Sequence, residues 1–129
     1  MILVDSSVWI DFFSSSPGRA GRELRRMIEE SEPLALTGVV VAEVLQGLTR
    51  EAGAIEEFLR QFDMLEPTGF EAYRAAAAIY RTARGKGVSL TTIDTLIAAI
   101  ALERRASLFT LDQDFSRIAH ITGLVLYRL

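Results

Sequence analysis

The sequence contains no cysteine and only one histidine, His120. Without cysteine, the chain has no disulfide framework, no thiolate zinc site and no cysteine nucleophile. A single histidine excludes a metal site built from several histidines and argues against a Ser-His-Asp triad. No apolar run approaches the roughly 20 residues of a membrane span, and no basic segment precedes Asp5 as a secretory signal would require. We therefore expect a cytoplasmic protein with no membrane partner.

Lysine is nearly absent, and the net charge is −3 at pH 7. A mildly acidic chain argues against a nucleic-acid partner, because phosphate binding usually requires a basic surface. However, all but one of the 14 basic residues are arginines, whose planar side chain suits phosphate contacts. These residues cluster at 19–26, 81–86 and 104–105, where they either contact a polyanion or form solvated helix faces.

The composition is typical of one compact domain. The chain has 129 residues, of which 50% are hydrophobic and 24% are charged. This is enough apolar surface to offset the entropy lost on folding. Because no linker and no internal repeat divides the sequence, we expect a single domain over residues 1–129.

Short apolar runs alternate with amphipathic helical segments along the chain. The runs predict buried strands, and apolar residues at helical spacing predict the helices between them. Residues 39–48 fit either class, but Glu43 and Gln46 favour a helix. This alternation predicts an α/β fold with a parallel sheet covered on both faces. The expected strands span 2–4, 33–36, 64–66, 107–110 and 124–127, and the expected helices span 7–13, 18–30, 39–48, 51–62, 70–84, 92–104 and 114–119.

Four of the six aspartates occupy unusual positions. Asp5 follows the first strand, Asp112 and Asp114 follow the strand at 107–110, and Asp94 opens the most apolar helix. In open α/β sheets, ligands bind at the carboxyl ends of the strands, near the point where the strand order reverses. Simpler roles remain open for three of them. Asp5 could cap the next helix, Asp94 could belong to a capping box opened by Thr91, and Asp112 could be a turn residue.

Glu43 lies in the apolar segment 39–45, where a charged side chain is costly unless it is paired or binds a cation. It could also face outward from an amphipathic helix. Several carboxylates at one sheet edge repel each other, and a divalent cation removes that repulsion. Because the available ligands are carboxylate oxygens, which are hard ligands, the expected ion is Mg²⁺ or Mn²⁺. Such a site favours phosphoryl transfer or phosphodiester hydrolysis.

Four segments resemble the PIN-domain ribonucleases, and in particular the VapC-type toxins of bacterial and archaeal toxin–antitoxin pairs. They read VDSSVWIDFF at 4–13, VVVAEVLQGL at 39–48, TTIDTLIAAIAL at 91–102, and LFTLDQDFSRIA followed by GLVL at 108–126. The resemblance extends over residues 1–127. It implies a PIN-like three-layer α/β/α fold with a parallel five-stranded sheet.

The resemblance also implies particular site residues, carried over position by position. The four acids expected to be catalytic and to hold the metal fall on Asp5, Glu43, Asp94 and Asp112. Asp114 is a further metal ligand near the fourth position. Whether Asp112 or Asp114 is the main acid at that position stays open. Supporting hydroxyl groups fall on Ser6 or Ser7 and on Thr110.

The expected activity is that of a Mg²⁺-dependent endoribonuclease, the toxin of a type II toxin–antitoxin system, with Glu43 or Asp112 as the base. The resemblance implies products with a 5′-phosphate and a 3′-hydroxyl, a homodimer, and silencing by a cognate antitoxin protein. Trp9, Phe12 and Phe13 could offer apolar surface to such partners, or could belong to the core. The alternative is a catalytically inactive PIN-fold module that binds RNA or protein.

Overall fold

The structure is a computed structural model that describes residues 1–129. Four short strands form one parallel sheet in the order β3-β2-β1-β4. Ile2 and Leu3 of β1 pair with β2 on one side, and β1 pairs with β4 on the other. The expected parallel sheet is thus present. The strands are β1 (Ile2–Val4), β2 (Leu34–Leu36), β3 (Asp63–Met64) and β4 (Ser107–Phe109).

Every helix expected from the apolar pattern is present, with ends shifted by a few residues. The ambiguous segment at 39–48 is a helix, as Glu43 and Gln46 indicated. None of the helices is long and apolar enough to cross a membrane. They are α1 (Ser6–Phe13), α2 (Arg19–Glu29), α3 (Gly38–Gly47), α4 (Ala52–Leu59), α5 (Phe70–Gly85), α6 (Thr92–Glu103) and α7 (Asp114–Ile121).

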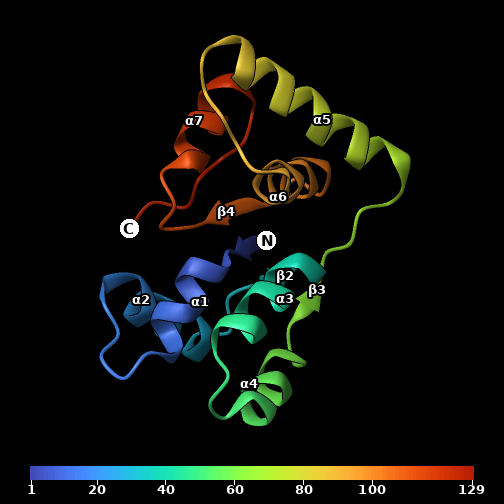
Figure 1. Ribbon diagram of the computed structural model, residues 1–129. Helices are drawn as coiled ribbons and strands as arrows, with labels where there is room; N and C mark the ends of the chain where they lie inside the picture. The colour runs from blue at the N-terminus through green and yellow to red at the C-terminus, as the bar shows by residue number, and fades with distance from the viewer.

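The crossovers run in two directions from the middle of the sheet. The chain steps from β1 to β2 to β3, and then returns past β1 to β4. Because parallel crossovers are right-handed, the two directions place their helices on opposite faces. Figure 1 shows α1 to α4 on one side of the sheet and α5 to α7 on the other. The strand order therefore reverses between β1 and β4, where a ligand site is expected.

The prediction of a fifth strand is wrong. Residues 124–127 lie beside β4 but form only a single parallel bridge, between Leu108 and Leu126. The Leu108 N–H donates to Val125 O at 2.9 Å, and the Tyr127 N–H donates to Leu108 O at 2.8 Å. Successive residues of a strand direct their backbone hydrogen bonds alternately to the neighbouring strand on one side and on the other. The first and last residues of β4 form their hydrogen bonds with the β1 side. Because β4 has three residues, only its middle one is left to pair with the C-terminal segment.

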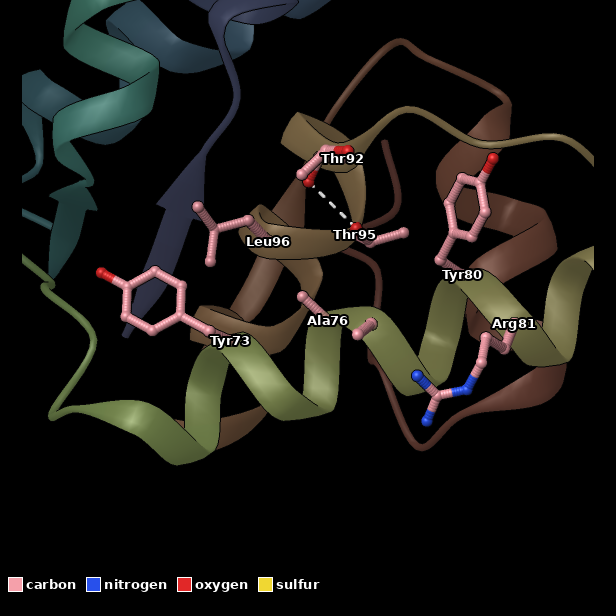
Figure 2. A pocket seen from close by; sticks show the side chains of 8 residues that line it. Tyr73, Ala76, Tyr80, Arg81, Thr92, Thr95 and Leu96 are labelled. Atoms are coloured by element: carbon pink, nitrogen blue, oxygen red, sulfur yellow. Dashed lines mark hydrogen bonds between the residues drawn. The ribbon is translucent and has the colours of Figure 1, made fainter.

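A continuous core of 28 buried residues fills the space between the sheet and the helices. Trp9 is fully buried and Phe12 is 8% exposed, so the core interpretation of these aromatics is the correct one. They pack edge-to-face or stacked with Phe13, Phe58 and Phe62 in one aromatic cluster between α1 and the segment at 58–62. On the other face, α5 packs against α6, and a cavity of about 390 Å³ opens between these two helices (Figure 2).

Helix α2 is capped by a side chain from α1. Gly18 stands at its N-cap position and has no side chain to offer. The Asp11 carboxylate accepts hydrogen bonds from the Gly18 N–H at 3.0 and 3.1 Å and from the Gly21 N–H at 2.8 Å. Two of the N–H groups that a helix start leaves unpaired are satisfied in this way. Asp11 is thus the one aspartate near the first strand with a purely structural role.

Candidate metal centre

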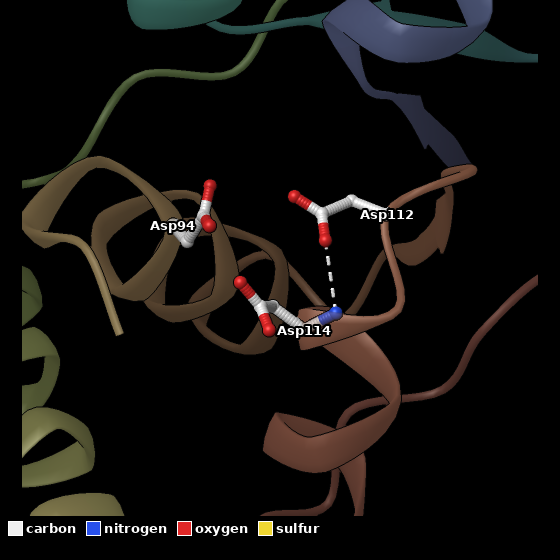
Figure 3. A group of neighbouring side chains, drawn as sticks. All are labelled: Asp94, Asp112 and Asp114. Carbon is white, nitrogen blue, oxygen red and sulfur yellow. Dashed lines mark hydrogen bonds between the residues drawn. The ribbon is translucent and has the colours of Figure 1, made fainter. Parts of the chain in front are cut away.

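Three aspartates converge at the sheet edge where the strand order reverses. Asp94 lies in the first turn of α6, Asp112 in the loop after β4, and Asp114 at the first residue of α7. One carboxylate oxygen from each lies within 4.8 Å of the others. Figure 3 shows the three side chains directed toward one another. We call them the three-carboxylate group.

Local structure holds two of these residues in place through their backbones. The Asp94 N–H donates to Thr91 Oγ1 at 3.1 Å, which caps α6. The return bond of a capping box, from the Thr91 N–H to the Asp94 carboxylate, is not formed, and that carboxylate faces the other two acids. Asp112 Oδ1 accepts from the Asp114 N–H at 2.9 Å, as in an Asx turn. The cap and turn roles therefore coexist with the cluster.

Asp5 is 4% exposed and follows β1 directly. It occupies the N-cap position of α1, yet its side chain makes no capping hydrogen bond, so the simple capping role is wrong. Instead, Oδ2 accepts one hydrogen bond from Ser7 Oγ and one from Thr110 Oγ1, both at 2.8 Å. A buried carboxylate needs such donors, because an unpaired charge is very costly there.

The same two hydroxyls also fix the loop after β4. Ser7 Oγ accepts from the Leu111 N–H at 3.0 Å, and Thr110 Oγ1 accepts from the Asp112 N–H at 3.0 Å. The buried Asp5 is thereby linked to the backbone that carries Asp112. Of the two serines left open by the sequence, Ser7 is the one that supports Asp5.

Ser6 supports a different acid. Its hydroxyl donates to Glu43 Oε1 at 3.1 Å, across from α1 to α3. Glu43 is half-buried and turned toward the start of α1, so the outward-facing interpretation is wrong. Burial raises the pKa of Glu43 above its ordinary value, and the charges of Asp5 and Asp112 raise it further against the opposing effect of Ser6. The hydrogen bond to Ser6, the residue after Asp5, places Glu43 beside the acidic site.

At Asp94, burial and the neighbouring carboxylates act in the same direction. Burial raises the pKa of Asp94 to about 6, and the carboxylates of Asp112, Asp5 and Asp114 add to the effect. The only neighbouring cation in an ion pair is Arg117, whose Nη1 lies 3.4 Å from Asp114 Oδ1. Crowded carboxylates with one exposed arginine beside them are the arrangement that a divalent cation stabilises.

The donor set fits a hard cation. Asp94, Asp112 and Asp114 offer carboxylate oxygens, and the group contains no histidine or cysteine, which suits Mg²⁺ or Mn²⁺. The structure brings Asp94, Asp112 and Asp114 closest together, and Asp5 and Glu43 lie outside that group. Both Asp112 and Asp114, left as alternatives by the sequence, belong to it.

Comparisons with known proteins agree with this architecture. The PIN domain family model matches residues 2–121. Ribonuclease VapC11 of Mycobacterium tuberculosis is 35% identical over 128 residues, which cover 96% of each chain. The chain therefore belongs to the PIN-domain family and, within it, to the VapC group.

Two solved structures show the same fold at low sequence identity. The DNA-bound VapBC from Salmonella typhimurium superposes with a TM-score of 0.78 at 18% identity, covering 98% of this chain and 96% of that one. VapBC2 from Rickettsia felis, bound to a promoter DNA fragment, has a TM-score of 0.77 at 19% identity and covers 98% of each chain. The three-dimensional arrangement is thus shared by proteins whose sequences have diverged widely.

Proposed function

We propose that this chain is a divalent-metal-dependent endoribonuclease and the toxin component of a type II toxin–antitoxin pair, with residues 1–129 forming one nuclease domain. The observation that carries the proposal is the three-carboxylate group, with Asp5 and Glu43 beside it, at the sheet edge where the strand order reverses. The 35% identity to a protein named as a ribonuclease, over nearly the whole of both chains, supports it.

Asp94, Asp112 and Asp114 would hold a Mg²⁺ or Mn²⁺ ion, with Asp5 and Glu43 completing the acidic site. A bound ion of this kind supplies Lewis-acid stabilisation of charge on the phosphate and lowers the pKa of water. The raised pKa of Asp94 supports this assignment, because burial and then the neighbouring carboxylates disfavour its charged form when no cation is bound.

Glu43 is the base in this proposal. Ser6 donates to its Oε1, so Oε2 is the oxygen that accepts a proton from the attacking water. The water oxygen forms a bond to phosphorus while the bond to the ribose O3′ breaks. The departing O3′ takes up a proton from solvent water, which leaves a 5′-phosphate and a 3′-hydroxyl. Asp112 is the second candidate for the base, since its carboxylate is exposed and also near Glu43. Ser7 and Thr110 hold Asp5 immobile and keep the site arranged before substrate arrives.

The partners follow from the same proposal. We expect the substrate to be RNA in the cytoplasm, the working form to be a homodimer, and a cognate antitoxin protein to silence it. The VapBC complexes among the solved structures of this fold support an antitoxin partner. An antitoxin that placed an arginine or lysine beside the three-carboxylate group would neutralise the charge that the metal otherwise neutralises.

The deciding experiment is RNA cleavage by the purified protein with Mg²⁺, with EDTA, and after Asp94→Asn substitution. We expect cleavage only for the wild type with metal, and an exposed-surface variant, Arg128→Ala, should cleave normally. A catalytically inactive binding module would instead bind RNA or protein equally well in all conditions and cleave nothing. If RNA cleavage is as fast in EDTA as in Mg²⁺, the metal-dependent mechanism is wrong.

A further inference from the structure

A second concave surface lies on the side of α6 that faces away from the three-carboxylate group. It is the cavity of about 390 Å³ between α5 and α6. Thr92 and Leu96 line it from the first turns of α6. Asp94 follows Thr92 by two residues, so its side chain is rotated by about 200° around the helix axis, at about 100° per residue. The acids and the cavity therefore share the start of one helix but occupy its opposite sides.

Two tyrosines of α5 line this cavity, which we call the slot. Tyr73 and Tyr80, seven residues apart on α5, lie on the same helix face, with Ala76 between them (Figure 2). The small side chains of Ala76 and Ala77 also line it. Tyr73 is 53% exposed, which is a large apolar area to leave in water. Tyrosine rings around a shallow slot are the groups on which unpaired nucleobases stack.

Unpaired positive charge adjoins one end of this slot. Arg81 lines the slot, and Arg84 and Lys86 follow on the same helix end. None of the three lies within ion-pair distance of a carboxylate, whereas Arg26, Arg60, Arg74 and Arg117 all do. Arg84 Nη1 donates to the Tyr80 hydroxyl at 3.3 Å, which ties the basic cluster to the aromatic wall. Cations without protein counter-charges are available to phosphate groups.

We propose that the slot between α5 and α6 binds a nucleobase of single-stranded RNA that flanks the cleaved phosphodiester. Tyr73 and Tyr80 stack against the base, and Arg81, Arg84 and Lys86 contact the adjoining phosphates. The inference rests on the proposed function, because it takes the three-carboxylate group as the place of cleavage. The segment at 87–91 leads from the basic end of α5 to the start of α6. The strand therefore has to cross only about the 10 Å diameter of one helix.

The binding test uses a fluorescein-labelled single-stranded RNA and fluorescence anisotropy in EDTA, where no cleavage occurs. Tyr73→Ala and Tyr80→Leu should each weaken binding by about 5- to 150-fold, the range expected for the loss of one base–aromatic stack. The leucine keeps an apolar side chain at the half-buried position of Tyr80 but removes the ring, and circular dichroism checks the fold. Arg74→Ala is the matched control, because Arg74 lies on the same helix but pairs with Glu71, and it should bind like the wild type.

A series of RNAs with one abasic position tests the contact itself. Removing the base that occupies the slot should weaken binding to the wild type and have no further effect on Tyr73→Ala. If both tyrosine variants bind RNA with wild-type affinity and still cleave it, the proposal that the slot binds a nucleobase is wrong and the nuclease proposal stands. If RNA binding depends on the tyrosines but no RNA is cleaved, the result supports nucleobase binding in the slot and refutes the nuclease proposal. If the variants dissociate an oligomer in light scattering, a second copy of the chain covers the surface and the inference is wrong.

Discussion

Thr110 Oγ1 donates a hydrogen bond to Asp5 Oδ2 at 2.8 Å, although the two residues are 105 positions apart in the sequence. They meet because β1 and β4 are neighbours in the sheet, with Val4 paired to Phe109. The same hydroxyl accepts the Asp112 N–H at 3.0 Å. One threonine thereby fixes both the buried acid after β1 and the loop that carries an exposed acid of the site.

Replacing this threonine tests its positioning role. Thr110→Val keeps the shape but removes the donor to a buried carboxylate, a loss of about 1.5–3 kcal/mol for a hydrogen bond to a charged group. We expect kcat for RNA cleavage to fall by roughly 10-fold or more if that loss falls on the transition state. Thr110→Ser, which retains the hydroxyl, should recover most of the rate. A valine variant with wild-type kcat and wild-type metal affinity would contradict the role.

Metal binding should depend on pH in the range where Asp94 titrates. The pKa of Asp94 is raised to about 6, first by burial and then by Asp112, and a cation binds only the ionised carboxylate. Mn²⁺ affinity should therefore fall by about tenfold for each pH unit below 6 and change little above pH 7. Titration calorimetry in two buffers of different ionisation enthalpy measures the proton released. Equal affinity at pH 5 and pH 7 would contradict the prediction.

The same raised pKa predicts how the stability of the metal-free protein changes with pH. The ordinary value for an aspartate is 3.8, so between pH 3.8 and about 6 the folded chain binds more protons at Asp94 than the unfolded chain. The free energy of unfolding then falls as the pH rises through this range. Allowing for solvent screening of a half-buried group, the loss is about 1–2 kcal/mol.

Asp94→Asn isolates this contribution. In EDTA at pH 7.5, the variant should melt at a higher temperature than the wild type, and at pH 4 the two should melt together. Mg²⁺ should stabilise the wild type and have little effect on the variant. The measurement is thermal unfolding followed by circular dichroism at the two pH values. A variant that is less stable than the metal-free wild type at pH 7.5 would show that burial and the neighbouring carboxylates do not destabilise the charged form of Asp94.

The helices and most strands could be predicted because each has a local signal. The spacing of Leu24, Met27 and Ile28 predicts α2, and the apolar run at 2–4 predicts β1. The fifth strand could not be judged in this way. Its residues are apolar enough for a strand, but its pairing is limited by the three-residue length of β4, a property of another segment. Strand pairing depends on both partners, and a local pattern describes only one.

The acids of the site could also be predicted in outline. Residues that follow neighbouring parallel strands must share one edge, which applies to Asp5 and Asp112. Thr110 could be named as a supporting hydroxyl, but the choice between Ser6 and Ser7 could not be made, because consecutive residues at the start of a helix point about 100° apart. That rotation directs Ser6 toward Glu43 and Ser7 toward Asp5. No pattern in the sequence indicates which acid each serine meets.

Asp11 provides a stability test that is independent of the acidic site. Its carboxylate accepts the N–H groups of Gly18 and Gly21 at the start of α2, a helix that has no capping side chain of its own. Asp11→Ala should lower the free energy of unfolding by about 1–2 kcal/mol, the usual cost of losing an N-cap acceptor. Asp11→Asn keeps one acceptor oxygen and should lose less.

Urea unfolding followed by the fluorescence of Trp9, the only tryptophan, measures both variants. Because Asp11 does not contact the acids, the metal affinity of Asp11→Ala should equal that of the wild type while the urea midpoint falls. An unchanged midpoint would mean that water caps α2 as well as the carboxylate does. A parallel loss of metal affinity would instead mean that α1 transmits the change to Asp5 and Ser7, the residues at its other end.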